Sequence, residues 1–107
     1  MFRACAVAAF VCVLARPAVA DAIDGDWCGE KGQHLTIKGP EITTPSGVTL
    51  KGNYHRHEFS YTAPPGDAEP GMQIYLKLLN EDFMNFYLVK DGKPGEPELW
   101  RRCEVIS

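Results

Sequence analysis

The chain has 107 residues, of which 45% are hydrophobic and 23% carry a charge. This length is enough for one small domain and too short for several. With 14 acidic residues against 11 basic ones, the formal net charge is −3. That balance argues against a nucleic-acid partner, because binding to phosphates needs a basic face.

The first residues have the features of a secretory signal. Met1–Arg3 is a short basic start, Ala4–Ala15 is apolar, and Ala18–Ala20 supplies the small residues that a signal peptidase requires. The apolar run is too short to anchor the chain in a bilayer. We therefore predict a signal peptide over residues 1–20, with cleavage near Ala20.

Residues 21–107 would then form one exported domain, located in the periplasm or outside the cell and without a membrane anchor. Loss of Arg3 and Arg16 with the signal would leave 9 basic and 14 acidic residues, a formal net charge of −5. We expect this domain to be a monomer. Its acidic charge favours a basic protein or a neutral small molecule as the partner.

The cysteines predict one disulfide. Cys5 and Cys12 lie in the signal, which leaves Cys28 and Cys103 near opposite ends of the exported domain. Disulfides persist in oxidising compartments, and a bridge closing so long a loop would stabilise the fold by about 4–5 kcal/mol. Two free thiols are one alternative. A zinc site is another, although the CxxC spacing typical of such sites is missing.

Glycine and proline recur every eight to twelve residues, which is typical of an all-β chain with short strands. No segment has a convincing helical period. We predict an all-β fold, either a small antiparallel meander or a closed or nearly closed eight-stranded barrel. The predicted strands cover residues 25–29, 33–38, 41–44, 48–51, 54–62, 72–79, 83–90 and 98–105.

Two hairpins are predicted from their turns. A turn at Gly52–Asn53 would place Val48, Leu50, His55, His57, Phe59 and Tyr61 on the inner face, and Thr49, Lys51, Tyr54, Arg56 and Glu58 on the outer face. A turn over Asn80–Asp82 would pair Leu78 with Met84, Leu76 with Phe86 and Ile74 with Leu88.

A Cys28–Cys103 bridge would bring the first and last strands side by side. A meander whose ends meet in this way is a closed or nearly closed barrel, and closure removes the exposed strand edges that promote aggregation. Because the strands are short, we expect side chains to fill the interior, with no room for a large ligand.

Gly25-Asp26-Trp27 resembles the GxW motif of the lipocalin or calycin group. Trp100-Arg101-Arg102, in the last predicted strand, resembles the stretch with the late arginine of this group, which packs across that tryptophan at the closed end of the barrel. The resemblance implies a calycin-like barrel. We expect Trp27 and Trp100 to fill the barrel end, with a sugar-binding platform as the alternative. Small exported calycin-like inhibitors of bacterial metalloproteases share the GxW motif and the size.

Ser46-Gly47 resembles the start of the Ser-Gly-x-x-Tyr-x-x-Gly motif of periplasmic inhibitors of c-type lysozyme. Those inhibitors are small eight-stranded barrels with a cysteine near the start bridged to one near the end. Leu50 replaces the tyrosine, and Gly52 comes one residue early. The resemblance implies a basic envelope or host protein, such as a lysozyme or a protease, as the partner.

An exposed patch beside this motif is our candidate partner-binding site. Tyrosine and arginine on a protruding hairpin are residue types favoured at interface hot spots, and an ordinary polar face is the alternative. The candidate partner-binding residues are Ser46, Gly47, Lys51, Tyr54 and Arg56.

His55 and His57 are the alternative site, for a metal or a small ligand. A metal would need a third ligand on their face, and His34 is expected to point outward. We therefore favour packing for these two side chains. No catalytic motif and no cofactor-binding motif is present, so we expect a non-catalytic binding or inhibitor module.

Overall fold

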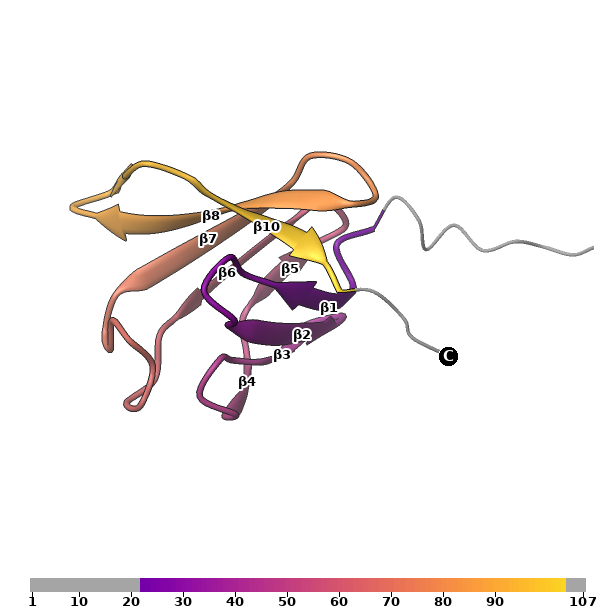
Figure 1. The fold of residues 1–107 in the computed structure, drawn as a ribbon. Coiled ribbons are helices and arrows are strands. Elements are labelled where there is room, and N and C mark those ends of the chain that lie inside the picture. The colour runs from indigo at the N-terminus through magenta and orange to yellow at the C-terminus, as the bar shows by residue number, and fades with distance from the viewer. Residues whose placement is uncertain (1–21, 104–107) are drawn as a thin grey trace, which may run out of the picture.

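The computed structural model describes residues 22–103, and all of its regular structure is β (Figure 1). The predicted signal peptide and the last two residues of the predicted final strand lie outside this range. No helix within residues 22–103 is long and apolar enough to cross a membrane. The strands are β1 (Gly25–Cys28), β2 (His34–Lys38), β3 (Glu41–Thr43), β4 (Thr49–Lys51), β5 (Asn53–His55), β6 (Glu58–Thr62), β7 (Gln73–Leu78), β8 (Phe83–Lys90), β9 (Lys93–Pro94) and β10 (Glu98–Arg102).

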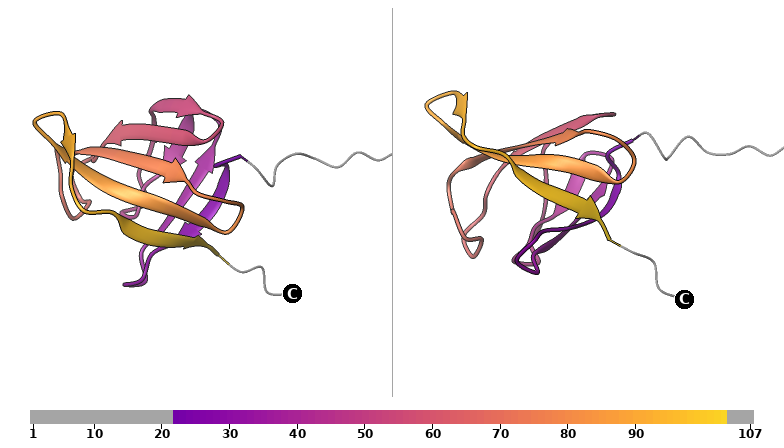
Figure 2. Two further views of the ribbon diagram at one scale, coloured as in Figure 1. Left: turned by 90° about the horizontal axis from the view of Figure 1, so that it is seen from above. Right: turned by 45° about the horizontal axis from the view of Figure 1, so that its top comes forward.

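These strands form one antiparallel sheet in the order β4-β3-β2-β1-β10-β8-β7-β6-β5, with the short β9 added to β8. The two outermost strands, β4 and β5, are separated in the chain only by Gly52. The sheet therefore curls until its ends meet, and the barrel is nearly closed (Figure 2). This confirms the predicted all-β barrel. It has ten strands instead of eight, because the segment predicted as one strand over 54–62 is two and β9 is additional.

The predicted contact between the two ends of the chain is present. β1 pairs with β10 in antiparallel register, with Trp27 opposite Arg102 and Cys28 opposite Arg101. The Cys28 and Cys103 sulfur atoms are bonded at 2.02 Å, and the two Cα atoms are 5.2 Å apart. The sequence prediction of this disulfide is confirmed.

The hairpin of β7 and β8 has the predicted register. Ile74 pairs with Leu88, Leu76 with Phe86 and Leu78 with Met84. The turn is fixed by Asn80, whose side-chain oxygen accepts hydrogen bonds from the backbone N–H groups of Asp82 (2.9 Å) and Phe83 (3.0 Å). Such side-chain bonds to the backbone explain why asparagine is common in turns.

The predicted turn at Gly52–Asn53 is wrong. The chain does not reverse there: β4 pairs with β3, and β5 pairs with β6. The reversal comes at Arg56 and His57, which places Tyr54 opposite Phe59 and His55 opposite Glu58. Moving the turn changes the face of every side chain in β5, since side chains alternate along a strand.

The two histidines therefore point outward. His55 and His57 are exposed, whereas Tyr54 is half-buried and packs against the core. Tyr54 and Phe59 meet edge to face, with ring centroids 6.4 Å apart. The predicted inner position of both histidines and the predicted outer position of Tyr54 are corrected by this register.

The core consists of large apolar side chains that have at most 2% of their surface exposed. Burial of each such side chain stabilises the fold by about 1.5–3 kcal/mol. The predicted inward position of both tryptophans is confirmed, whereas the interior is filled as predicted only outside the cavity described below. The largest core side chains are Trp27, Trp100, Phe59, Leu35, Ile37, Ile42, Ile74, Leu76 and Met84.

Candidate functional site: the open mouth of the barrel

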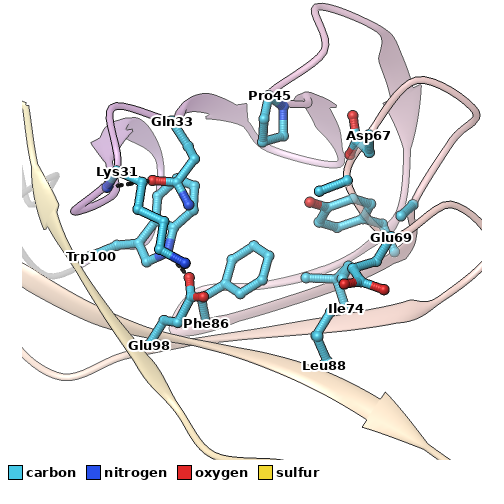
Figure 3. Close-up of a pocket in the computed structure, with 13 residues that line it drawn as sticks. Lys31, Gln33, Pro45, Asp67, Glu69, Ile74, Phe86, Leu88, Glu98 and Trp100 are labelled. Carbon is cyan, nitrogen blue, oxygen red and sulfur yellow. Dashed lines mark hydrogen bonds between the residues drawn. The ribbon is translucent and has the colours of Figure 1, made fainter.

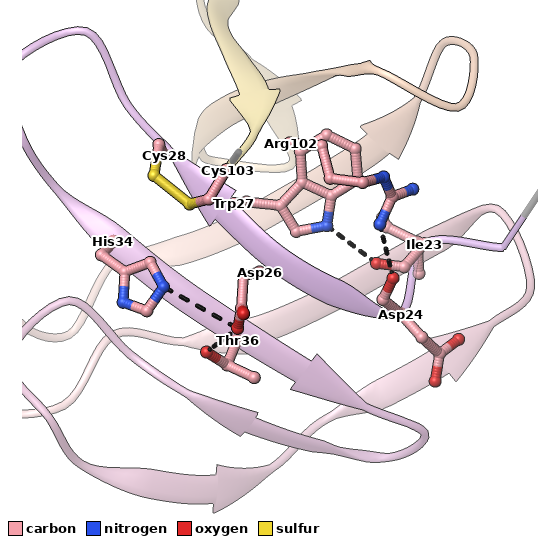
Figure 4. A network of polar contacts seen from close by, with 9 residues as sticks. All are labelled: Ile23, Asp24, Asp26, Trp27, Cys28, His34, Thr36, Arg102 and Cys103. Carbon is pink, nitrogen blue, oxygen red and sulfur yellow. Dashed lines mark hydrogen bonds and ion pairs between the residues drawn. A yellow bond between two sulfur atoms is a disulfide. The ribbon is translucent and has the colours of Figure 1, made fainter. Parts of the chain in front are cut away.

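One end of the barrel is closed by the segment that precedes β1 (Figure 4). Ile23 is fully buried there. Its backbone N–H donates to the carbonyl of Arg56 at 2.8 Å, and its carbonyl accepts a 2.8 Å hydrogen bond from the indole N–H of Trp27. The segment therefore acts as a plug at this end of the barrel.

Arg102 covers the plug. Its guanidinium carbon lies 4.3 Å from the centroid of the Trp27 ring. The guanidinium also donates to the carbonyls of Asp24 (2.7 Å), Ala22 (3.2 Å) and Glu81. Burial lowers the pKa of Arg102, while nearby carboxylates oppose that shift.

Tyr54 also belongs to the closed end. Its hydroxyl donates a short hydrogen bond to the Asp24 carboxylate, and this bond, followed by burial, raises the pKa of Tyr54. The other Asp24 oxygen accepts a 2.8 Å hydrogen bond from the backbone N–H of Gly39. The predicted exposed position of Tyr54 is wrong, because its hydroxyl is held in the plug.

The opposite end of the barrel is open and leads to a cavity of about 350 Å³ (Figure 3). This volume lies near the small end of the range for ligand sites, about 300–1,000 Å³. Its walls are mostly apolar, and charged side chains surround the entrance. The lining residues used below are Lys31, Pro45, Tyr61, Ala63, Asp67, Glu69, Ile74, Phe86, Leu88, Glu98 and Trp100.

An aromatic pair forms one wall of the cavity. Phe86 and Trp100 stack with ring centroids 5.0 Å apart and an interplanar angle of 6°. The Trp100 indole N–H donates to the Glu98 carboxylate at 3.1 Å. A side chain at Gly29 would come within 2.9 Å of the Trp100 ring, so the glycine lets the first loop approach this wall closely.

The other side of the mouth is polar. The Asp67 carboxylate accepts hydrogen bonds from the Thr44 hydroxyl (3.0 Å) and from the backbone N–H of Ser46 (3.1 Å). These bonds tie the loop after β6 to the β3–β4 turn. Tyr61 lies beside them with only 3% of its surface exposed. Burial, with a smaller contribution from Asp67, raises the pKa of Tyr61, so its phenol stays neutral.

The structure separates the predicted partner-binding residues. Ser46 and Gly47 are exposed in the turn at the open mouth, and Lys51 is exposed at the far end of β4. Tyr54 and Arg56 lie at the closed end, where the Arg56 carbonyl holds the plug. The prediction that these five residues form one patch is therefore wrong, and only Ser46 and Gly47 lie beside the cavity.

His55 and His57 lie next to the β5–β6 turn, away from the mouth. Within residues 22–103, no group of three or more His, Cys, Asp or Glu side chains could hold a metal ion. His34 points outward as predicted, and its ring nitrogen lies 3.8 Å from the Asp26 carboxylate.

Most of the mouth was not predicted from the sequence. The sequence predicts Phe86 and Leu88 only as inner positions of a hairpin, and it predicts no role for the loop over residues 63–71. The available signal was that this loop is longer than the other connections between strands, because binding residues are often carried by surface loops. The contact between Asp67 and Thr44 spans 23 residues, and no local pattern predicts it.

Comparisons with known proteins give no relative from which a function could be transferred. No protein-family model, no curated protein and no solved structure matches the chain.

Proposed function

We propose that the protein is an exported, non-catalytic binding protein that holds a small ligand in the open mouth of its barrel. The observation that carries this proposal is the cavity of about 350 Å³, with apolar walls and a charged entrance. Ligand sites have this composition, and the mouth of a β-barrel is a frequent place for them. The ligand would lie against Phe86, Ile74 and Leu88.

Titration with indole, a neutral apolar probe, tests this proposal. We expect the methyl NMR signals of Ile74 and Leu88, which line the cavity, to shift with indole. Those of Leu35 and Ile37, which are buried but do not line the cavity, should stay in place. An Ala63→Leu variant fills the cavity from its wall and should abolish the shifts. Retention of the hydrogen-bonded Trp27 indole N–H signal would verify that the variant is folded. Equal shifts of the cavity-lining pair and of Leu35 and Ile37, or no shift at all, would contradict a site in the mouth.

Export is part of the proposal. It is supported by the signal-like residues 1–20 and by the Cys28–Cys103 bridge, since such bridges persist in oxidising compartments. We expect the mature protein to begin at Asp21 and to be recovered from the periplasm or the medium. The intact mass of the recovered protein checks this, and retention of residues 1–20 would contradict it.

Inhibition of a basic protein is a second candidate, favoured by the β3–β4 turn beside the mouth. Ser46 and Gly47 are exposed there, and Val48 has 38% of its surface exposed. Two backbone bonds of 2.8 Å, Gly47 N–H to the Thr44 carbonyl and Thr44 N–H to the Val48 carbonyl, make the turn rigid. A rigid protruding turn loses little entropy on binding.

A c-type lysozyme is the first partner to test, as the resemblance of Ser46-Gly47 implies. If this candidate is right, the protein inhibits the lysozyme, and Val48→Asp weakens inhibition while Leu79→Asp does not. Leu79 is a matched control, because it is an exposed apolar residue (47%) that follows β7, at the closed end. Equal inhibition by both variants, or no inhibition by the wild type, would count against the turn as a lysozyme contact.

A further inference from the structure

The charges around the mouth are unevenly distributed. Asp67 and Glu69 lie on one side of the cavity, and Lys31 and Glu98 lie on the other (Figure 3). The single ammonium group is thus offset by a carboxylate on its own side, and the acidic excess falls on the side of Asp67. Such an entrance attracts cations and repels anions.

A buried tyrosine whose hydroxyl has no hydrogen-bond partner within residues 22–103 lies on this acidic side. Tyr61 lines the cavity with 3% of its surface exposed. Its ring and that of Phe59 meet edge to face, with ring centroids 6.2 Å apart. No group among residues 22–103, however, forms a hydrogen bond with the Tyr61 hydroxyl. Nearly all buried polar groups in native proteins are paired. The missing partner is therefore expected inside the cavity, as water in the free protein and as a ligand group in the complex.

Asp67 is held so that one of its oxygens is available. Both of its side-chain bonds, from the Thr44 hydroxyl and the Ser46 N–H, go to Oδ1. In the part of the chain that the structure describes, Oδ2 accepts no hydrogen bond. A carboxylate fixed through one oxygen presents the other in a defined position, which lowers the entropy lost when a ligand binds.

We infer that the mouth selects a small organic cation, namely a primary amine with a compact apolar or aromatic body. The ammonium group would donate to the Tyr61 hydroxyl oxygen and to Oδ2 of Asp67. The body would lie against Phe86, Ile74 and Leu88. This inference rests on the proposed function, because it names the class of ligand for the same cavity.

Three probes with the same phenyl body and different head groups test the inference: 2-phenylethylamine, 2-phenylethanol and phenylacetate. Dissociation constants come from the methyl NMR shifts of Ile74 and Leu88. We expect the amine to bind about tenfold more tightly than the alcohol, as one charge-assisted hydrogen bond allows. Phenylacetate should bind most weakly, because its charge meets the acidic side of the mouth.

Variants separate the two head-group contacts. Tyr61→Phe should weaken amine binding several-fold and leave binding of the alcohol less affected. Asp67→Asn should remove the preference for the amine, and its amide oxygen can still accept the bonds from Thr44 and Ser46, so the fold is retained. Asp82→Asn, at the closed end, is the matched control and should leave all three affinities unchanged.

The outcomes distinguish the inference from the proposed function. If the alcohol or phenylacetate binds as tightly as the amine, or if Asp67→Asn keeps the full preference, the amine inference is wrong and the mouth remains a ligand site. If none of the three probes shifts the Ile74 and Leu88 signals, both the inference and the proposed function are wrong.

Discussion

At the scale of the residue, Arg102 joins segments that are far apart in the sequence, and no local sequence pattern predicts all of these contacts. It belongs to the last strand, packs on Trp27 of the first strand, and donates to the carbonyls of Ala22, Asp24 and Glu81. A guanidinium can do this because it offers five donors in one plane together with a flat face. Its neighbour Arg101 points to solvent.

Arg102→Ala should therefore destabilise the protein strongly. The change removes a cation–π contact and leaves partly buried carbonyls without their donor, and we expect a loss of about 2–3 kcal/mol in the free energy of unfolding. The loss for Arg102→Lys should be smaller than that for Arg102→Ala but larger than zero, because an ammonium cannot reach all three carbonyls. Arg101→Ala is the control and should change stability by less than about 0.5 kcal/mol. Urea denaturation measures all three, and equal effects of Arg102→Ala and Arg101→Ala would refute the role of Arg102.

Tyr54 makes the free energy of unfolding depend on pH in the alkaline range. Its pKa is raised above its ordinary value by the hydrogen bond to Asp24 and by burial, so the fold favours the neutral phenol. This contribution is fully present below about pH 10, the pKa of an unfolded tyrosine, and it is lost as pH rises through the folded-state pKa. We expect the unfolding free energy of Tyr54→Phe to fall less between about pH 9.5 and 11 than that of the wild type. Identical pH profiles would show that the bond to Asp24 has no such effect.

At the scale of the element, Gly52 decides how the sheet closes. The chain runs on from β4 to β5 through this residue, pairing first with β3 and then with β6. The Gly52 N–H donates to the carbonyl of Pro40 at 2.9 Å. A methyl group at this position would overlap the Ser60 carbonyl and lie 2.6 Å from the Phe59 ring, so only glycine lets the two sides of the sheet approach.

Gly52→Ala should open this junction. We expect a loss of about 1–3 kcal/mol, as for other substitutions that overfill a packed site, and increased hydrogen exchange at the backbone amides of β4 and β5. Gly95→Ala is a suitable control, since a methyl group there would meet only the Leu88 carbonyl, at 3.4 Å. Comparable stability of the two variants would mean that the close approach at Gly52 is unimportant.

At the scale of the whole molecule, the disulfide and the ladder of β1 with β10 join the two ends of the domain. The bonded cysteines are 75 positions apart, so the bridge restricts most of the unfolded chain. A domain of this size has a narrow margin of stability from its core alone.

Cys28→Ala/Cys103→Ala should lower the free energy of unfolding by about 4–5 kcal/mol, the loop-closure value for a bridge of this span. Denaturation of the wild type in a reductant should reproduce the loss, and the double variant should not respond to the reductant. A loss below about 1 kcal/mol would mean that strand pairing already holds the ends together in the unfolded ensemble.

Local sequence patterns were sufficient to predict the register of a hairpin where its short turn contains a residue typical of turns. Asn80 marked the β7–β8 turn, and the inner positions of that hairpin follow from it by alternation. The prediction failed at residues 53–61, because Gly52-Asn53 has the composition of a turn but the chain does not reverse there. The signal for the real turn was the polar run from His55 to Glu58 between the aromatic Tyr54 and Phe59.

The sequence by itself determined the all-β class, the bridged cysteines and the inward position of both tryptophans, since alternation and cysteine position are properties of the chain alone. The tertiary structure decided where the sheet closes, and hence that His55 faces solvent while Tyr54 faces the plug. It also decided which residues meet at the mouth, where Asp67, Tyr61 and Phe86 come from three separate segments. A cavity is space left by packing between distant segments, and no single segment of the sequence encodes it.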